Sequence, residues 1–166
     1  MIDSRIPPPL SGDELMVLNN WLEWHRGTLA VKCAGLSEEQ LRLRSAPPST
    51  MSLLGLVRHL AHVERVWFRR VLNGEDVPLL WGKERDNDAD FKEVDTASAE
   101  EAFATWQDEV ERARAISAAK PLDAVGDRKG QDCTHRWILV HMIEEYARHN
   151  GHADLLRERI DGVTGE

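Results

Sequence analysis

Two side chains in the last predicted helix have the types and the spacing of metal ligands. Between Thr134 and Ile160, apolar residues recur at helical intervals and form a stripe about 80° wide. Glu145 and His149 fall within this stripe or at its edge, and because they are four residues apart their side chains meet on one face. A carboxylate directed at an apolar core costs several kcal/mol unless it is neutralised, paired or bound to a cation. We therefore predict that both residues ligate a metal ion.

A third candidate ligand lies in the helix predicted from Ser52 to Leu72. His59 projects to the border of the buried face of this helix, whereas His62 projects about 160° from its centre, towards solvent. His59, Glu145 and His149 together would offer two imidazole nitrogens and one carboxylate oxygen. Such a set suits Zn²⁺, Ni²⁺ or Fe²⁺ and leaves coordination positions open for water or a substrate.

Other polar residues near these helices allow more than one interpretation. Glu64 projects close to the centre of its apolar stripe, where it could pair with an arginine or orient a metal ligand. Three further histidines, which fit packing, support of a ligand or the rim of a pocket, are His25, His141 and His152. Three aspartates resemble the start of an EF-hand loop, but the glycine and the terminal glutamate are misplaced, so we predict a solvated loop. They are Asp86, Asp88 and Asp90.

Several familiar catalytic motifs are missing from the sequence. The stretch from His141 to Glu145 does not match H-E-x-x-H, and only one helix approaches the Glu-x-x-His pattern of di-iron bundles. The chain also has no glycine-rich phosphate loop and no G-x-S-x-G.

Capping signals divide the chain into four long helices and one short helical turn. The predicted elements begin at Ser11 (to about Lys32), at Ser37 (the short turn), at Ser52 (to Leu72), at Ser98 (through Ile116) and at Thr134 (to Ile160). We find no convincing strand, and we predict loops over 74–97 and 120–132. The first of these loops is long enough to run back along the molecule. The sequence therefore predicts an all-α four-helix bundle with one long crossover, as a single domain over residues 1–166.

Composition narrows the classes of function. The chain has 166 residues, 42% of them apolar, and a formal charge of −8, which disfavours a nucleic-acid partner. No apolar run approaches the length of a membrane span, and Met1 to Arg5 lack the apolar core of a signal peptide. Cys33 and Cys133 match no C-x-x-C pattern, so a reducing cytoplasm is the simpler expectation.

Two stretches resemble the DinB-like (YfiT-type) superfamily of metal-binding bundles, in particular the branch once labelled as an uncharacterised mini-circle protein of actinobacteria. The first stretch runs from Ser52 to Arg65. The second, from Arg136 to Glu158, is the more specific. The order of helices and loops is similar too, so the likeness covers nearly the whole chain.

The resemblance implies an up-down-down-up, left-handed bundle that is usually a homodimer. It also implies a metal held by one residue of the second long helix and by two residues of the last, four apart. His59 matches the first of these ligands and His149 the last. Glu145 stands where many relatives have histidine and where thiol-dependent isomerases of the superfamily have glutamate. His152 stands where bacillithiol-type relatives often carry glutamine.

Characterised relatives use a low-molecular-weight thiol, mycothiol or bacillithiol, as a co-substrate. A metal suits that chemistry because coordination deprotonates the thiol at neutral pH. The resemblance thus implies a metal- and thiol-dependent S-transferase or isomerase that acts on a small electrophile. Two alternatives stay open. One is a catalytically silent metal-binding bundle that serves in stress or ligand binding, and the other is a structural dimer module in which an arginine neutralises Glu145.

Overall fold

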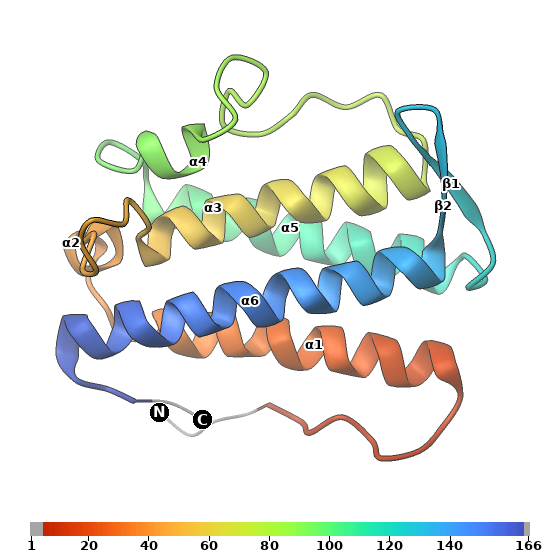
Figure 1. The fold of residues 1–166 in the computed structure, drawn as a ribbon, viewed down its shortest axis with the longest axis horizontal. Helices are drawn as coiled ribbons and strands as arrows, with labels where there is room; N and C mark the ends of the chain where they lie inside the picture. Colours follow the sequence, from red (N-terminus) through yellow and green to blue (C-terminus); the bar gives the residue numbers. More distant parts are fainter. Residues whose placement is uncertain (1–4, 165–166) are drawn as a thin grey trace.

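Four long helices make up most of the structure, a computed structural model that describes residues 5–164 (Figure 1). In chain order the elements are α1 (Glu14–Cys33), α2 (Glu38–Arg42), α3 (Leu53–Glu64), the π-helix η1 (Arg65–Leu72), α4 (Ala89–Lys92), α5 (Ala99–Ala118), β1 (Val125–Arg128), β2 (Gln131–Thr134) and α6 (His135–Asp161). The predicted all-α class is confirmed. Residues 1–4 and 165–166, the ends of the predicted domain, lie outside the described residues, and so does most of the stretch from Met1 to Arg5.

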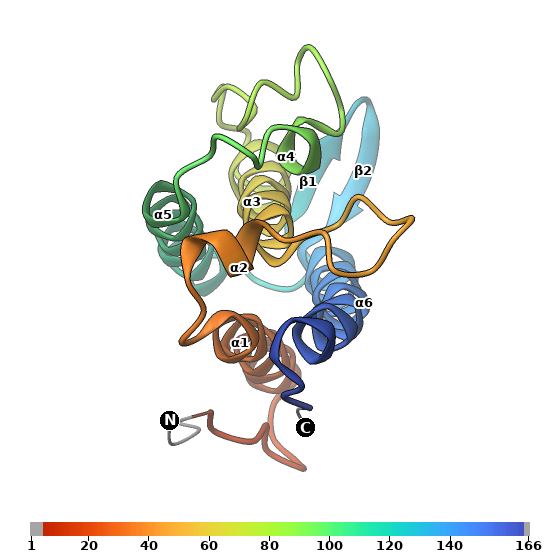
Figure 2. The ribbon, with the colours of Figure 1, turned by 90° about the vertical axis from the view of Figure 1, so that its left-hand side faces the viewer.

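The long helices run in two opposite directions across the molecule. In Figure 1, α1 and α6 run from right to left, and α3 with η1 and α5 run from left to right. Figure 2 views the bundle nearly end-on, with α1 packed beside α6 and α3 packed beside α5. Residues 73–98 return along the outside of α3 and carry α4, as the predicted crossover requires (Figure 1). Within the described part of the chain, no helix is long and apolar enough to span a bilayer.

The helix starts follow the capping signals, with one exception. Ser37 and Gln40 form a reciprocal capping box, and the Ser98 hydroxyl accepts a bond from the Glu101 amide. The expected start at Ser11 is wrong, because Asp13 caps α1 by accepting from the Met16 amide. Asp13 offers the same spacing and also places a negative charge at the positive end of the helix dipole.

A buried polar network crosses the core and takes one side chain from each long helix. The carboxylate of Glu64, fully buried on α3, accepts bonds of 2.8 and 2.6 Å from the Arg26 guanidinium on α1. The Tyr146 hydroxyl on α6 donates to Glu64 over 2.8 Å and accepts from the Trp106 indole on α5 over 2.9 Å. Of the two roles open to Glu64, the structure therefore shows pairing with an arginine.

Two local features depart from the sequence-based expectation. The helix predicted from Ser52 to Leu72 is α-helical only to Glu64 and continues as the π-helix η1, whose wider turns change which residues share a face. The expectation of no strand is also wrong, because β1 and β2 pair antiparallel over residues 125–134, in the predicted loop 120–132 and the two residues after it. Each strand is only four residues long and mostly exposed, so it lacks the apolar alternation by which strands are recognised.

Candidate metal centre

The predicted ligands His59, Glu145 and His149 come together where α3 faces α6. The Nε2 atom of His59 lies 3.0 Å from Oε1 of Glu145, and the Nε2 atom of His149 lies 3.5 Å from the same oxygen. One ligand atom from each residue can be chosen so that all lie within 4.8 Å of one another. Two ligands about 2.1 Å from a tetrahedral ion are about 3.4 Å apart, so these separations fit a shared divalent metal.

Each imidazole of the cluster contacts a further side chain through its other ring nitrogen, Nδ1. Nδ1 of His59 donates to the Asp90 carboxylate over 2.8 Å, and Nδ1 of His149 lies 3.3 Å from Nδ1 of His152. These contacts direct both Nε2 atoms towards Glu145. Bonds of this kind fix the tautomer and the orientation of metal-binding histidines, so the donor set and its supports fit a divalent metal site.

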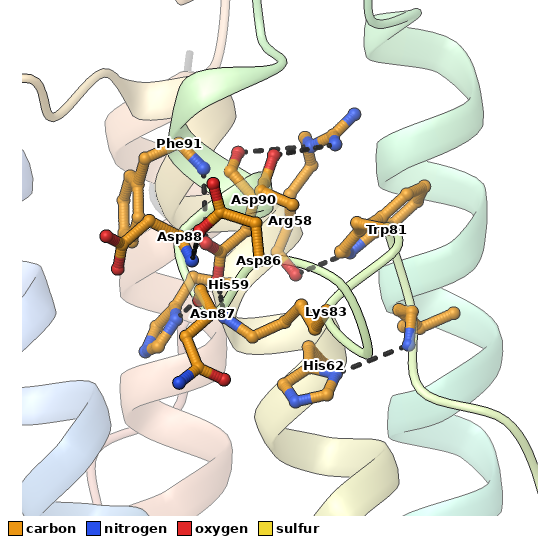
Figure 3. Close-up of polar contacts among 12 residues, drawn as sticks. Arg58, His59, His62, Trp81, Lys83, Asp86, Asn87, Asp88, Asp90 and Phe91 are labelled. Atoms are coloured by element: carbon orange, nitrogen blue, oxygen red, sulfur yellow. Dashed lines mark hydrogen bonds and ion pairs between the residues drawn. The ribbon is translucent and has the colours of Figure 1, made fainter.

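Sequence reasoning missed the place of Asp90 in the candidate site, beside His59. The expected solvated loop holds for Asp86 and Asp88, which are paired with Lys92 at the surface, but it is wrong for Asp90, whose exposed fraction is 0%. The Lys83 ammonium donates over 2.6 Å to Oδ2 of Asp90, the same oxygen that accepts from His59 (Figure 3). No local signal separates Asp90 from its two neighbours, because its partner His59 is 31 residues away.

His62 is also placed differently from its prediction. It was expected to lean towards solvent, but segment 73–98 covers it, and the Leu80 amide donates to its Nδ1 over 3.4 Å (Figure 3). Burial, followed by the nearby positive charge of Lys83, lowers the pKa of His62 to about 4. A helical projection cannot foresee this, because it takes no account of a loop that folds over the outer face.

The remaining candidate histidines lie around the cluster or away from it. His152 supports His149, as described above, and His141 stacks on the ring of Trp137 one helical turn before Glu145. His25 does not belong to the cluster: its ring and its carbonyl contact the Asn150 amide between α1 and α6.

The electrostatics of the cluster keep the Glu145 carboxylate ionised. Hydrogen bonds from His149 and His59 outweigh burial and lower the pKa of Glu145 well below its usual range. Burial opposes the charge on His59, but the bonds to Asp90 and Glu145 outweigh it and raise the pKa of His59. The protein thus keeps an ionised carboxylate beside an imidazole whose proton a metal can displace.

A large hollow of the described structure lies elsewhere, between α1 and α5. Its volume is about 1510 Å³, and none of the three predicted ligands lines it. Several charged side chains in its wall are held in ion pairs, such as Arg114 with Glu23 and Lys32 with Asp154. The candidate metal centre of His59, Glu145 and His149 is therefore separate from this hollow.

The chain matches the sequence model of a known protein family. The sequence model of the family described as Mycothiol-S-transferase matches residues 17–162, which include all three residues of the cluster. The chain belongs to this family. The resemblance to the DinB-like superfamily is thereby confirmed. A comparison with curated proteins found no match.

Proposed function

We propose that this member of the mycothiol S-transferase family is a divalent-metal-dependent enzyme that transfers mycothiol, or a thiol of that type, to a small electrophile. The observation that carries the proposal is the convergence of two imidazoles and one carboxylate within 4.8 Å. The family match adds the class of co-substrate. Zn²⁺ and Ni²⁺ are the ions that we favour, with Fe²⁺ as a third candidate, because imidazole and carboxylate ligands accept all three.

In this proposal each residue of the cluster has a defined task. His59 and His149 would hold the ion through Nε2, and Glu145 would hold it through a carboxylate oxygen. A divalent ion bound there lowers the pKa of a thiol that it coordinates and so supplies a nucleophile at neutral pH. In the transfer, the sulfur forms a bond to the electrophilic carbon, the leaving group departs with its bonding pair, and the thiol proton passes to solvent.

The surroundings of Glu145 argue against a purely structural role. A structural dimer module would need an arginine to neutralise the carboxylate of Glu145, which lies on the inward face of α6. In the described residues, its ion-pair partners are instead His59 and His149. Two imidazoles beside one carboxylate oxygen are suited to metal binding. Once their Nε2 atoms are deprotonated, the lone pairs of these nitrogens can coordinate the ion.

The first test measures metal content and identifies the ligands. We expect purified protein to hold about one equivalent of divalent metal by elemental analysis and His149→Ala to lose it. His62→Ala serves as the matched control, because His62 lies on α3 near the site but faces segment 73–98. Protein that stays metal-free after addition of Zn²⁺ or Ni²⁺ would remove the proposal.

The second test measures thiol transfer. Conjugation of monobromobimane or chlorodinitrobenzene is followed with mycothiol, bacillithiol and cysteine, before and after removal of the metal with a chelator. We expect a metal-dependent rate with mycothiol that is lost in His149→Ala. A protein that binds metal but conjugates none of the thiols would instead be a silent metal-binding bundle.

A further inference from the structure

A second hollow is lined by residues of the β1–β2 hairpin and of the start of α6. Figure 1 shows this hairpin at the end of the bundle where α6 begins. Its volume is about 410 Å³, within the range of small-molecule sites. The residues that line it are Arg128, Gln131, Asp132, Cys133, Thr134 and Trp137. The hairpin that forms its wall is fixed against η1, because a Cβ atom on Gly126 would lie only 2.3 Å from the Val71 carbonyl oxygen.

The aromatic wall of the hollow is Trp137, whose ring is partly exposed to solvent although it packs against other aromatic rings. Trp137 stacks on His141 with centroids 5.0 Å apart and an interplanar angle of 14°, and it lies 5.3 Å from Trp67. The Arg128 guanidinium sits 4.4 Å above the ring of Trp67. Even so, 47% of the Trp137 surface is exposed. A fixed, exposed indole beside polar side chains has the make-up of a ligand platform.

A row of side chains on α6 connects this platform with the metal centre. Trp137, His141 and Glu145 follow at intervals of four residues and therefore share one side of the helix. Solvent reaches each of them, with exposed fractions of 47% for Trp137, 24% for the His141 side chain and 17% for the Glu145 side chain. Eight residues of α-helix rise about 12 Å. A molecule of that length could lie along the row with one end at each site.

We propose that the hairpin hollow binds the hydroxyl-rich end of the thiol co-substrate while its sulfur reaches the cluster of His59, Glu145 and His149. This subsite rests on the proposed function and names the part of the co-substrate that is recognised. Mycothiol joins its cysteine to a glucosaminyl-inositol unit, which has apolar C–H faces and many hydroxyls. Those faces can pack on the Trp137 ring, Asp132 and Gln131 can accept from hydroxyls, and Arg128 can donate to them. No covalent bond changes in the hollow.

The first experiment measures binding without any reaction. Saturation-transfer NMR follows glucosaminyl-inositol, the part of mycothiol without the cysteine, on the full chain with and without Zn²⁺. We expect wild-type protein and His149→Ala to bind it alike, and we expect Trp137→Leu and the double variant Gln131→Ala/Asp132→Ala to bind it at least about tenfold more weakly. Leu155→Ala, an exposed apolar residue elsewhere on α6, is the control that should bind normally. Absent binding to wild-type protein, or equal binding to all variants, overturns the subsite.

The second experiment separates the subsite from the proposed function. With monobromobimane as the electrophile, the hollow variants should raise the KM for mycothiol about tenfold and leave the KM for N-acetylcysteine, which has no sugar, unchanged. A merely structural role of the hairpin would instead affect both thiols. If no thiol reacts but the sugar unit binds in the hollow, the subsite stands and the proposed transfer falls. If mycothiol reacts and the variants do not change its KM, the transfer stands and the subsite falls.

Discussion

At the scale of single residues, the cluster depends on the carboxylate of Asp90, which is not itself one of the three predicted metal ligands. Asp90 is buried, holds Nδ1 of His59 and is in turn held by Lys83 (Figure 3). We expect Asp90→Asn to weaken Zn²⁺ binding about 10- to 100-fold, because the imidazole loses the partner that orients it and raises its basicity. Competition with a chromogenic chelator measures the change.

Two control variants separate this effect from general loosening of segment 73–98. Asp88→Asn changes an exposed carboxylate two residues away and should leave the affinity unchanged. Lys83→Met removes the other partner of Asp90 but leaves its bond to His59. Equal losses in Asp90→Asn and Lys83→Met would show that attachment of the segment, and not orientation of His59, controls the affinity.

His62 should make the free energy of unfolding of the protein depend on pH. The pKa of this histidine is lowered to about 4 in the folded protein by burial and by Lys83 and His59, against the opposing charges of Asp90 and Glu84. In the unfolded chain the pKa is about 6.5, so below that pH the unfolded state takes up a proton that the folded state does not. The free energy of unfolding should therefore fall between about pH 6.5 and pH 4.

The variant His62→Gln tests this contribution, because glutamine can still accept from the Leu80 amide but cannot titrate. Urea unfolding of both proteins at pH 7.5 and pH 5 should show that the variant loses about 1–2 kcal/mol less than the wild type over this range. Parallel losses in the two proteins would contradict the assignment to His62.

At the scale of elements, the buried network of Arg26, Glu64, Tyr146 and Trp106 ties all four long helices together. We expect Glu64→Ala to lower the free energy of unfolding by about 3–5 kcal/mol, because the buried Arg26 charge loses its buried partner and keeps only Glu23, which is partly exposed. Chemical denaturation measures the loss. Glu144→Ala is the matched control, since Glu144 is an exposed partner of Arg148 within α6 and should change stability by no more than about 0.5 kcal/mol.

The same network allows a second test, in which a further substitution should restore stability. Replacing both charges, with Arg26→Met and Glu64→Leu together, removes the ion pair without leaving an unpaired charge. Such a replacement should recover most of the stability lost in Glu64→Ala. A double variant as unstable as the single one would mean that the shape of the pair, and not its charge balance, matters to the bundle.

At the scale of the whole molecule, the metal should act as a clamp between α3 and α6, because its ligands come from both helices. An ion at 100 times its dissociation constant stabilises the folded state by about 2.7 kcal/mol. For a chain of this size, that corresponds to a rise in Tm of about 5–10 °C. Calorimetry with added Zn²⁺ should show this rise in the wild type and none in His149→Ala. The homodimer that the resemblance implies stays a prediction, which sedimentation analysis would test.

The sequence alone determined those features that depend on local spacing. Apolar periodicity predicted the four long helices, and Ser37 and Ser98 marked helix starts through bonds to amides three residues away. The pair Glu145 and His149 could be recognised because residues four apart on a helix must share a face. His59 followed from its place at the edge of the buried stripe, and the resemblance to a known family supported the same three residues.

Tertiary structure decided everything that depends on contacts between distant segments. Asp90 and Asp88 have the same chemistry and nearly the same neighbours, yet only Asp90 meets His59, because the crossover folds back over α3. The same fold-back buries His62, which the helical projection placed in solvent. The short hairpin 125–134 is stabilised by its packing on η1 and not by its own apolar pattern. Local spacing fixes the direction of a side chain on its own element, whereas only the packed chain determines what stands opposite it.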